Sequence, residues 1–342
     1  MTLTSTEYGT GAAMFGCEGP VLGASEAAFF RDFDPFGFIV FARNVETPDQ
    51  LRRLTGDLRN AVGREAIISV DQEGGRVQRL RAPHWREWLP PLDTVTKAGP
   101  NAARAMNLQA QIIASELRAV GIDSNCAPVG DVASDLTHPF LRNRCYSDSP
   151  VRVAEIALAV ADGYLAGGVL PVMKHMPGHG RSHVDTHLDL PVVDADRASL
   201  LEIDFAPFKA LSHLSMGMTA HLIFGAYDPD HPSTQSKIMV EVIRSEIGFD
   251  GLLITDDLNM QALKGTLYDR TARSMAAGAD IALHCKGDLA EMQTVALAAG
   301  NMQPDTQRRA KAALAQRIAP KSVDIAALES EFYALMGTHH DG

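Results

Sequence analysis

The chain has 342 residues, with 31 Lys and Arg against 42 Asp and Glu, so its formal net charge is −11. This length is too great for a small disulfide scaffold, and it allows either two domains of about 150 residues or one α/β barrel of roughly 250 residues with extensions. A hydrophobic share of 46% with 21% charged residues is ordinary globular composition and excludes a disordered chain. The acidic balance argues against nucleic acid or an anionic membrane as partner, although it allows a small local basic patch.

The sequence carries no targeting feature that we recognise. No Lys or Arg precedes Arg31, so we expect no signal peptide, and polar residues interrupt every apolar stretch well before the roughly 20 residues of a spanning helix. The cysteines are scattered without a CxxC pair, which favours free thiols in a reducing compartment. We therefore expect a cytoplasmic protein. The cysteines are Cys17, Cys126, Cys145 and Cys285.

Short β-rich apolar runs alternate with helical patterns along most of the chain. Eight such runs, with no Pro/Ser-rich linker and no shift in composition, favour a single (β/α)8 barrel over residues 1–302. A doubly wound sheet is the alternative, but no GxGxxG turn follows the first strand. The predicted strands are Ala12–Gly16, Gly37–Phe41, Ala66–Val70, Ile122–Pro128, Val169–Lys174, Met216–Ala220, Leu252–Thr255 and Ile281–His284.

Helical patterns fill the spaces between these strands, and glycines such as Gly121 and Gly278 follow them as expected just past a helix. Two further helical stretches predict a C-terminal extension, residues 303–342, packed on the barrel. The predicted helices are Pro48–Ala61, Ala103–Val120, Val151–Ala166, Leu200–Leu214, Lys237–Ile247, Tyr268–Ala277, Asp305–Arg317 and Val323–Met336.

Polar side chains follow nearly every predicted strand. In a βα barrel the loops after the strands build the catalytic face, so residues from separate strands meet there. A purely structural barrel needs no such clustering, and the pattern therefore favours an enzyme. These residues are Arg43, Asn44, Asp71, Glu73, Asp131, Lys174, His175, His221, Asp256 and Asp257.

Two segments offer groups for an oxygen-rich ligand. In SVDQEGGRVQRL (69–80), Asp71 ends a strand and can accept two hydrogen bonds from neighbouring hydroxyls of a ligand. Arg79 can return toward the same end of the barrel, where the loops after the strands meet. In NRCYSDSP (143–150), Arg144 is another possible donor. A solvated loop with an Asp71–Arg79 ion pair, and a surface role for Arg144, are the alternatives.

The segment VMKHMPGHGRSHVDTHLDLP (172–191) holds four histidines in an irregular loop. A zinc site is one hypothesis, but no HExxH and no His pair at i, i+4 on a predicted helix accompany the histidines. The other is a mobile loop that carries one acid/base residue. Asp185 and His187 are two residues apart, so an extended backbone places them on one side, where the carboxylate would raise the pKa of the imidazole. His187 would then donate a proton to a leaving group near neutral pH.

The segment GLLITDDLNM (251–260) ends an apolar strand in two adjacent carboxylates. Because side chains alternate along a strand, only one of the two is expected to point into the catalytic end of the barrel. There it could serve as nucleophile, general base or hydrogen-bond acceptor. The residues alone do not choose between Asp256 and Asp257, and the other carboxylate is expected to cap the following helix.

Together these segments resemble the family-three glycoside hydrolases, specifically the compact bacterial β-N-acetylglucosaminidases of cell-wall recycling. The resemblance covers residues 16–300 and rests on VDQEGGRVQRL, KHMPGHGRSHVDTH and ITDDLNM, with FARN at 41–44 and NCAPVGDV at 125–132. Two small departures are Met176, where an aromatic residue is usual, and Cys145, where Ser is usual; Met176 could alter how the loop packs.

The resemblance implies roles for individual residues. Asp256 would be the nucleophile and His187 the acid/base, paired with Asp185, in a two-step retaining hydrolysis. It implies an exo-acting enzyme that removes N-acetylglucosamine from muropeptides, with no cofactor and no metal, and we expect a monomer. The residues implied to hold the sugar ring are Asp71, Arg79, Arg144, Lys174 and His175.

The sequence leaves three alternative functions open. A β-glucosidase of the same fold would share Asp256 but give no reason for the whole KHxPGHG loop. A metal-dependent hydrolase would use the histidine cluster, and a non-catalytic sugar-binding protein would need neither Asp256 nor His187. The sequence also leaves open whether phosphorolysis competes with hydrolysis.

Overall fold

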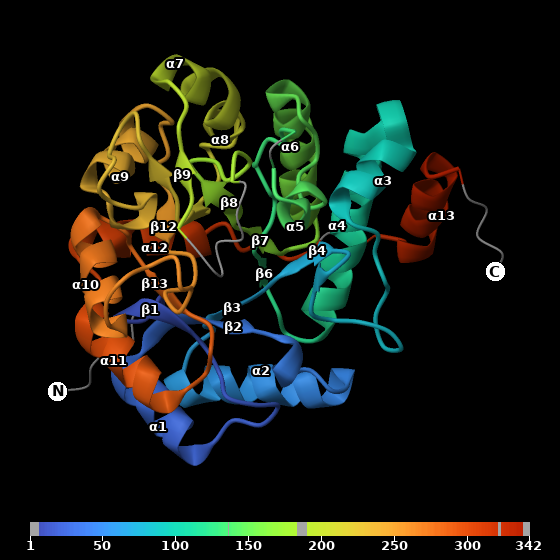
Figure 1. Cartoon of the computed structure of the whole chain (residues 1–342). Helices are drawn as coiled ribbons and strands as arrows, with labels where there is room; N and C mark the ends of the chain where they lie inside the picture. The colour runs from blue at the N-terminus through green and yellow to red at the C-terminus, as the bar shows by residue number, and fades with distance from the viewer. Residues whose placement is uncertain (1–6, 136, 183–189, 321–322, 338–342) are drawn as a thin grey trace.

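The computed structural model describes residues 7–135, 137–182, 190–320 and 323–337. Parallel strands lie at the centre, and helices surround them (Figure 1). This arrangement confirms the predicted α/β class with parallel strands.

The strands are short, and most of them pair in parallel. Their bounds are β1 Gly11–Gly16, β2 Pro35–Val40, β3 Ile67–Val70, β4 Gln72–Gly74, β5 Val77–Gln78, β6 Ser124–Asn125, β7 Leu170–Pro171, β8 Met173–Met176, β9 Val192–Val193, β10 Met216–Thr219, β11 Ile223–Phe224, β12 Leu252–Ile254 and β13 Ala282–His284. One sheet has the order β13-β1-β2-β3-β6-β7, and a second has the order β12-β10-β8. Isolated parallel bridges join the two sheets, from Ile254 to Ile281 and from Val129 to Lys174.

Capping residues and glycines mark the ends of several helices. Thr47 caps α2 by accepting from the N–H of Gln50, and Gly63 ends that helix with φ of 66°. Gly121 and Gly278 follow their helices with positive φ, as expected. The helices are α1 Ala24–Phe33, α2 Pro48–Val62, α3 Pro91–Ala98, α4 Ala102–Ala119, α5 Pro139–Arg142, α6 Pro150–Ala166, α7 Arg197–Ser199, α8 Ala206–Ala210, α9 Lys237–Ser245, α10 Leu267–Ala277, α11 Leu289–Ala299, α12 Pro304–Leu314 and α13 Ile325–Leu335, with short helical turns η1 Ala42–Asn44, η2 Gly99–Asn101, η3 Leu200–Asp204 and η4 Ser233–Gln235.

Several predicted elements differ in detail. The single helix predicted over Leu200–Leu214 is broken into α7, a π-type turn (η3) and α8, where Pro207 lies in the first turn. The strand predicted over Ile122–Pro128 pairs only over β6. Helices α1, α3 and α11 and the antiparallel hairpin β4–β5 are not among the predicted elements.

Alternate side chains of the strands pack into two different apolar clusters. In β1, Ala13 and Phe15 belong to the larger cluster between strands and helices, whereas Ala12 and Met14 belong to an inner cluster among the strands. The period of two in a strand explains this division. With both faces buried, each strand appears in the sequence as a nearly continuous apolar run.

The two C-terminal helices pack in different places. Residues Ala310 and Ala313 of α12 join the inner cluster. Helix α13 places Phe332 edge-on against Trp88, with ring centroids 5.5 Å apart, next to the hairpin β4–β5. Among the helices of the described residues, none is long and apolar enough to cross a membrane.

Candidate active site

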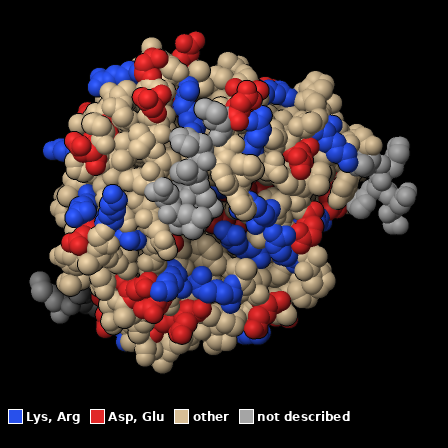
Figure 2. All heavy atoms as spheres, in the orientation of Figure 1, with Lys and Arg blue, Asp and Glu red and all other residues tan. Residues whose placement is uncertain are grey.

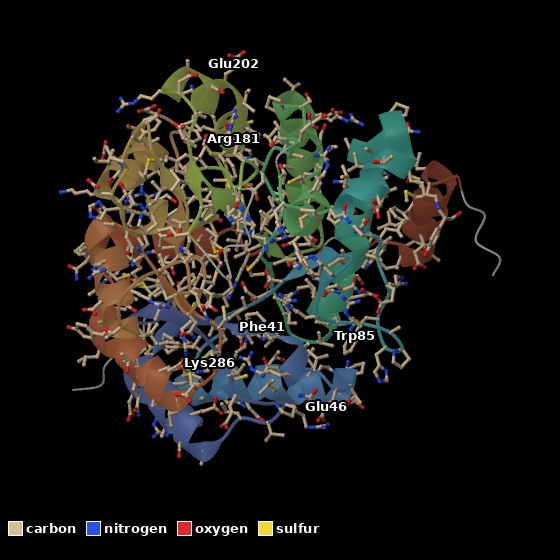
Figure 3. The ribbon with its side chains drawn as sticks, in the orientation of Figure 1. Phe41, Glu46, Trp85, Arg181, Glu202 and Lys286 are labelled. Carbon is tan, nitrogen blue, oxygen red and sulfur yellow. The ribbon has the colours of Figure 1, made fainter. Side chains whose placement is uncertain are left out.

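A pocket of about 280 Å³ lies where several strands end. Figure 2 shows a hollow near the middle of this face with Lys and Arg side chains at its border, and Figure 3 places Phe41, which follows β2, near the centre of the ring of helices. The residues that line it come from loops far apart in the sequence. They are Ile39, Phe41, Asp71, Arg76, Val77, Arg79, Phe140, Leu141, Arg144, Lys174, His175, His179, Met218, Asp256, Asp257, Met260, Leu283 and Cys285.

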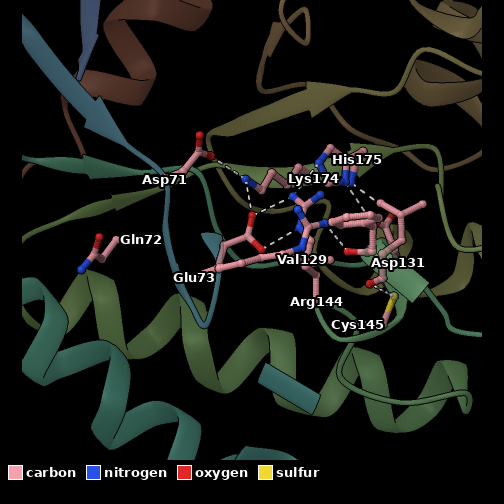
Figure 4. A network of polar contacts seen from close by, with 12 residues as sticks. Asp71, Gln72, Glu73, Val129, Asp131, Arg144, Cys145, Lys174 and His175 are labelled. Atoms are coloured by element: carbon pink, nitrogen blue, oxygen red, sulfur yellow. Dashed lines mark hydrogen bonds and ion pairs between the residues drawn. The ribbon is translucent and has the colours of Figure 1, made fainter. Parts of the chain in front are cut away.

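Strand alternation arranges the acidic residues that follow β3. Asp71 and Glu73 share one face, while Gln72 points the opposite way (Figure 4). The Gln72 amide oxygen accepts from the N–H of Arg79, at 2.9 Å, which fixes the hairpin β4–β5 and brings Arg79 back beside Asp71. The residue between the two carboxylates therefore holds the turn.

The Lys174 ammonium joins the two carboxylates. Its Nζ lies 2.7 Å from Asp71 Oδ1 and 2.6 Å from Glu73 Oε1, and the side chain is 2% exposed. Arg144 binds Glu73 through two parallel hydrogen bonds, Nε to Oε2 at 2.9 Å and Nη2 to Oε1 at 2.7 Å. Arg79 donates to Asp71 Oδ2 at 3.0 Å. Three cations and two carboxylates thus form one network, and Figure 4 shows the part made by Asp71, Glu73, Lys174 and Arg144.

The pKa values follow from this network. Burial raises the pKa of Glu73, but the charges of Arg144 and Lys174 outweigh it and bring the pKa to about 2. The pKa of Asp71 is also well below its usual range, because Lys174 and Arg79 overcome the effect of burial. Burial lowers the pKa of Lys174, yet Asp71 and Glu73 raise it above its ordinary value. All of these groups are therefore charged at neutral pH.

His175 is held by a second buried carboxylate. Its Nδ1 lies 2.7 Å from Asp131 Oδ2, and its Nε2 lies 3.2 Å from Arg144 Nη2. Because a guanidinium only donates, Nε2 must accept, so the ring proton resides on Nδ1 and points at Asp131. The other oxygen of Asp131 accepts the backbone N–H groups of His175 and His179. Asp131 thereby sets the shape of the turn between these histidines.

His179 lies beside His175, with ring centroids 5.3 Å apart. Burial lowers the pKa of His179 to about 4, so the ring is neutral at neutral pH. Its Nδ1 is buried and has no hydrogen-bond partner among the residues that the structure describes. A neutral ring of this kind suits binding of a ligand hydroxyl or a water molecule better than carrying a charge.

The two adjacent carboxylates after β12 have different surroundings. Asp257 Oδ1 accepts the backbone N–H of Asn259 and of Cys285, at 3.1 and 3.2 Å, so this side chain ties the loop to the end of β13. Asp256 lines the pocket, and its Oδ1 accepts the N–H of Asp257 at 2.8 Å. Burial raises the pKa of Asp256, but His221, His175, the Asp257 N–H and Lys174 favour the carboxylate, so its pKa lies below the usual value.

Six of the eight site residues proposed from the sequence come together around this pocket. The other two, Asp185 and His187, lie outside the described residues. The six are Asp71, Arg79, Arg144, Lys174, His175 and Asp256.

Glu73, Asp131 and His179 belong to the site without a site role predicted from the sequence, although the first two follow predicted strand ends. The spacing of Glu73, two residues after Asp71, was the available signal for one of them. Asp131 acts on a loop 44 residues away, for which no local pattern exists. The two departures from the family motifs are buried and lie beside the site: Met176 fills the space over Gly217, and Cys145 Sγ donates to the Leu141 carbonyl.

Within the described residues, no group of three or more His, Cys, Asp or Glu side chains is arranged to hold a metal ion. His183, Asp185 and His187 of the loop predicted as a possible zinc site are outside those residues. The small pocket has paired cations and carboxylates at one side and the ionised carboxylate of Asp256 at the other. Such a set suits an uncharged ligand with many hydroxyl groups.

Comparison with known proteins gives consistent matches. The N-terminal domain of glycosyl hydrolase family 3 matches residues 30–319. A β-hexosaminidase of Alkalilimnicola ehrlichii is 37% identical over 282 residues, covering 80% of each chain. NagZ from Neisseria gonorrhoeae, solved with N-trifluoroacetyl-D-glucosamine, has a TM-score of 0.84 and 28% identity over 96% of this chain and 99% of that one; a structure with zinc ion also exists. A family 3 β-N-acetylglucosaminidase from Paenibacillus sp. has a TM-score of 0.80 and 29% identity, and the match spans 95% of this chain but 61% of that longer one.

Proposed function

Because the chain belongs to glycoside hydrolase family 3 and is a glycoside hydrolase, we propose that it is a retaining exo-β-N-acetylglucosaminidase. The relatives named β-hexosaminidase and NagZ support N-acetylglucosamine as the sugar released. Peptidoglycan fragments in which N-acetylglucosamine is joined to an anhydromuramyl peptide are the proposed substrates. The enzyme would act in the cytoplasm as a monomer, without cofactor.

The proposed mechanism has two steps. Asp256 attacks the anomeric carbon while His187, paired with Asp185, protonates the departing oxygen, giving a glycosyl-enzyme. His187 then takes a proton from water, the resulting hydroxide attacks the same carbon, and the sugar leaves with retained configuration. A histidine here replaces the carboxylic acid that most retaining glycosidases use.

The observation that carries this proposal is the position and charge of Asp256. A carboxylate nucleophile must be ionised and must face the bound sugar. Both carboxylates line the pocket, but Oδ1 of Asp257 accepts two backbone N–H groups, whereas Asp256 accepts one and has a lowered pKa. This difference supports the first member of the pair as the nucleophile.

The network of Asp71, Arg79, Arg144, Lys174 and His175 is proposed to bind the hydroxyl groups of the sugar ring. Asp71 keeps lone pairs for a ligand hydroxyl, because each of its two oxygens accepts from one cation. Buried and already paired, these groups change little when the sugar enters, which lowers the cost of ordering them.

We also propose that the two parallel sheets join into a closed (β/α)8 barrel over residues 1–302, with residues 303–342 as its helical extension. The bridges from Ile254 to Ile281 and from Val129 to Lys174 support this, since they connect the two sheets at both edges. Both isolated bridges are parallel, as the fold requires.

The direct test replaces Asp256 by Ala and measures turnover of an aryl N-acetyl-β-glucosaminide. We expect kcat to fall about a thousandfold or more. Asp305→Ala, which removes an exposed carboxylate at the start of α12, is the matched control and should keep wild-type turnover. Near-wild-type turnover of Asp256→Ala would show that the nucleophile is a different group.

A second experiment tests His187. For His187→Ala, substrates with activated phenol leaving groups should lose less activity than substrates with poor leaving groups, because only the latter need a proton in the transition state. Equal losses for both classes would count against an acid role. A burst of aryl leaving group in wild-type enzyme would support the covalent intermediate.

A further inference from the structure

His221 is a buried histidine that the mechanism above does not use. It follows β10 on a loop behind Asp256, is 0% exposed, and does not line the pocket. Both ring nitrogens have partners: Nδ1 lies 2.8 Å from the hydroxyl of Thr234, and Nε2 lies 3.1 Å from the backbone carbonyl of Asp257. Both distances are those of hydrogen bonds.

The partners determine where the ring carries its proton. A carbonyl oxygen only accepts, so Nε2 must be the donor toward Asp257. Burial lowers the pKa of His221, so the ring is neutral at neutral pH, and Nδ1 is then an acceptor. The hydroxyl of Thr234 must therefore donate to Nδ1.

A second threonine makes this arrangement possible. The hydroxyl of Thr219 lies 2.7 Å from that of Thr234 and can donate to it. The Thr234 hydroxyl also lies 3.0 Å from the carbonyl of Ala220, but that carbonyl accepts the hydroxyl of Ser233 and is satisfied without the Thr234 proton, which Nδ1 of His221 needs. Donation therefore runs from Thr219 to Thr234, from Thr234 to His221, and from His221 to the Asp257 carbonyl. All four side chains in this region are 0% exposed, so water does not compete.

The chain of hydrogen bonds ends next to the proposed nucleophile. His221 holds the carbonyl of Asp257, and the N–H of the same residue donates to Asp256 Oδ1 at 2.8 Å. Fixing the Asp257 backbone therefore fixes the donor that orients the Asp256 carboxylate. Cys285 N–H holds the Asp257 carboxylate from the other side, so the residue is anchored from β10 and from β13.

We propose that His221 is a positioning residue, which acts as a neutral Nε2–H donor set by Thr219 and Thr234 and holds Asp257 so that Asp256 faces the anomeric carbon. This inference rests on the proposed role of Asp256 as nucleophile. We expect substitutions of His221 to lower kcat rather than to raise KM, because His221 does not line the pocket that is proposed to bind the sugar.

The expected result for His221→Leu is a kcat lower by roughly 10- to 100-fold on an aryl N-acetyl-β-glucosaminide, with KM within about threefold of wild type, because a small displacement of a reacting group has an effect of this size. His221→Gln, whose side-chain amide can reach the same carbonyl, should recover much of kcat. His213→Leu, the same change at an exposed histidine, should match wild type.

The pH profile provides a readout that loss of stability does not imitate. Without His221 the N–H of Asp257 is held less firmly, so Asp256 loses part of a hydrogen bond that lowers its pKa, and the acidic limb of kcat/KM should move to higher pH. His221 itself also favours the Asp256 carboxylate, so its removal moves the pKa of Asp256 in the same direction, and Thr234→Val separates the two effects because it keeps the histidine. The other groups that face Asp256 are the same in both proteins. They are His175, His179, Lys174, Cys126, Cys285 and the backbone of Asp257.

Thr234 tests the proton arrangement without touching the histidine. Thr234→Val removes the donor to Nδ1 and should lower kcat in the same direction as His221→Leu, whereas Thr234→Ser keeps the hydroxyl and should resemble wild type. Thermal unfolding of every variant shows whether it is folded. The inference is overturned if folded His221→Leu and Thr234→Val both keep wild-type kcat and pH profile while Asp256→Ala is inactive. If Asp256→Ala is itself active, the proposed function fails instead.

Discussion

The buried Lys174 ammonium offers the strongest test of how this site is held together. Replacing Lys174 by Met keeps the length and apolar stem of the side chain and removes its charge. In the wild type, three cations face two carboxylates; in the variant, Arg79 and Arg144 remain and each carboxylate keeps one guanidinium. Glu73 still has its two hydrogen bonds from Arg144, whereas Asp71 keeps only the single bond from Arg79.

The number of cations left to each carboxylate determines how much stability the variant loses. Removing one partner from a buried ion pair costs about 3–5 kcal/mol, because the other charge is left in a poorly solvated place. Since neither carboxylate is left wholly without a cation, we expect the lower end, about 3 kcal/mol, in the free energy of unfolding at pH 7.

The pH dependence sharpens the prediction. Glu73 has a folded-state pKa of about 2, below its unfolded value of 4.5, so the stability it contributes is complete above pH 4.5 and disappears as the pH falls toward 2. Asp71, whose pKa is also depressed, behaves in the same direction. The stability difference between wild type and Lys174→Met should therefore be largest at neutral pH and shrink below pH 4.5.

Urea unfolding at pH 7 and at successively lower pH values measures both quantities. Lys286→Met, which removes an exposed lysine paired with Glu291, is the matched control and should unfold like wild type. A difference below about 1 kcal/mol at pH 7, or a larger difference that does not depend on pH, would refute the argument that the buried charges stabilise one another.

Further predictions concern separate parts of the chain. The Asp131 carboxylate accepts three N–H groups, whereas the amide of Asp131→Asn has one accepting oxygen and an NH2 group that can only donate. We therefore expect the free energy of unfolding to fall by about 1–3 kcal/mol and KM to rise. Unchanged values would contradict the role of Asp131 in shaping the turn. Phe332→Ala should destabilise the enzyme by about 3–5 kcal/mol in urea, and unfolding at the wild-type midpoint would mean that α13 does not depend on Trp88. The buried His284, with a pKa lowered by burial to about 4, takes up a proton on unfolding between pH 4 and 6.5, so stability should rise with pH across this window and rise less steeply in His284→Gln; equal slopes would be inconsistent with a buried neutral ring. Dialysis against EDTA should leave turnover unchanged, whereas a loss that zinc restores would favour the metal-dependent alternative.

Periodicity and local chemistry let the sequence predict much of the fold. Apolar runs identified the principal parallel strands, since a strand buried on both faces shows as a continuous apolar segment. Alternation along a strand explains why Asp71 and Glu73 share a face, because that relation depends only on backbone geometry. The motif resemblance likewise identified the family, which the match over residues 30–319 shows.

Other features depended on contacts between distant segments. Arg144 meets Glu73 across 71 residues of sequence, and Lys174 meets Asp71 across 103, so no local pattern specifies either pair. The unpredicted hairpin β4–β5 depends on individual contacts: the Gly75 N–H donates to the carbonyl of Trp88, and the Gln72 amide oxygen accepts the N–H of Leu80.

The sequence by itself determined which residue types stand at the strand ends and that two adjacent carboxylates follow β12. It did not determine what each carboxylate does, because adjacent side chains of the same kind differ only in their surroundings. The tertiary structure places the N–H groups of Asn259 and Cys285 on Asp257, whereas Asp256, which lines the same pocket, accepts the N–H of Asp257. A side chain's partners and pKa arise from groups that folding brings within hydrogen-bond distance, and for Asp257 one of those groups lies 28 residues further along the chain.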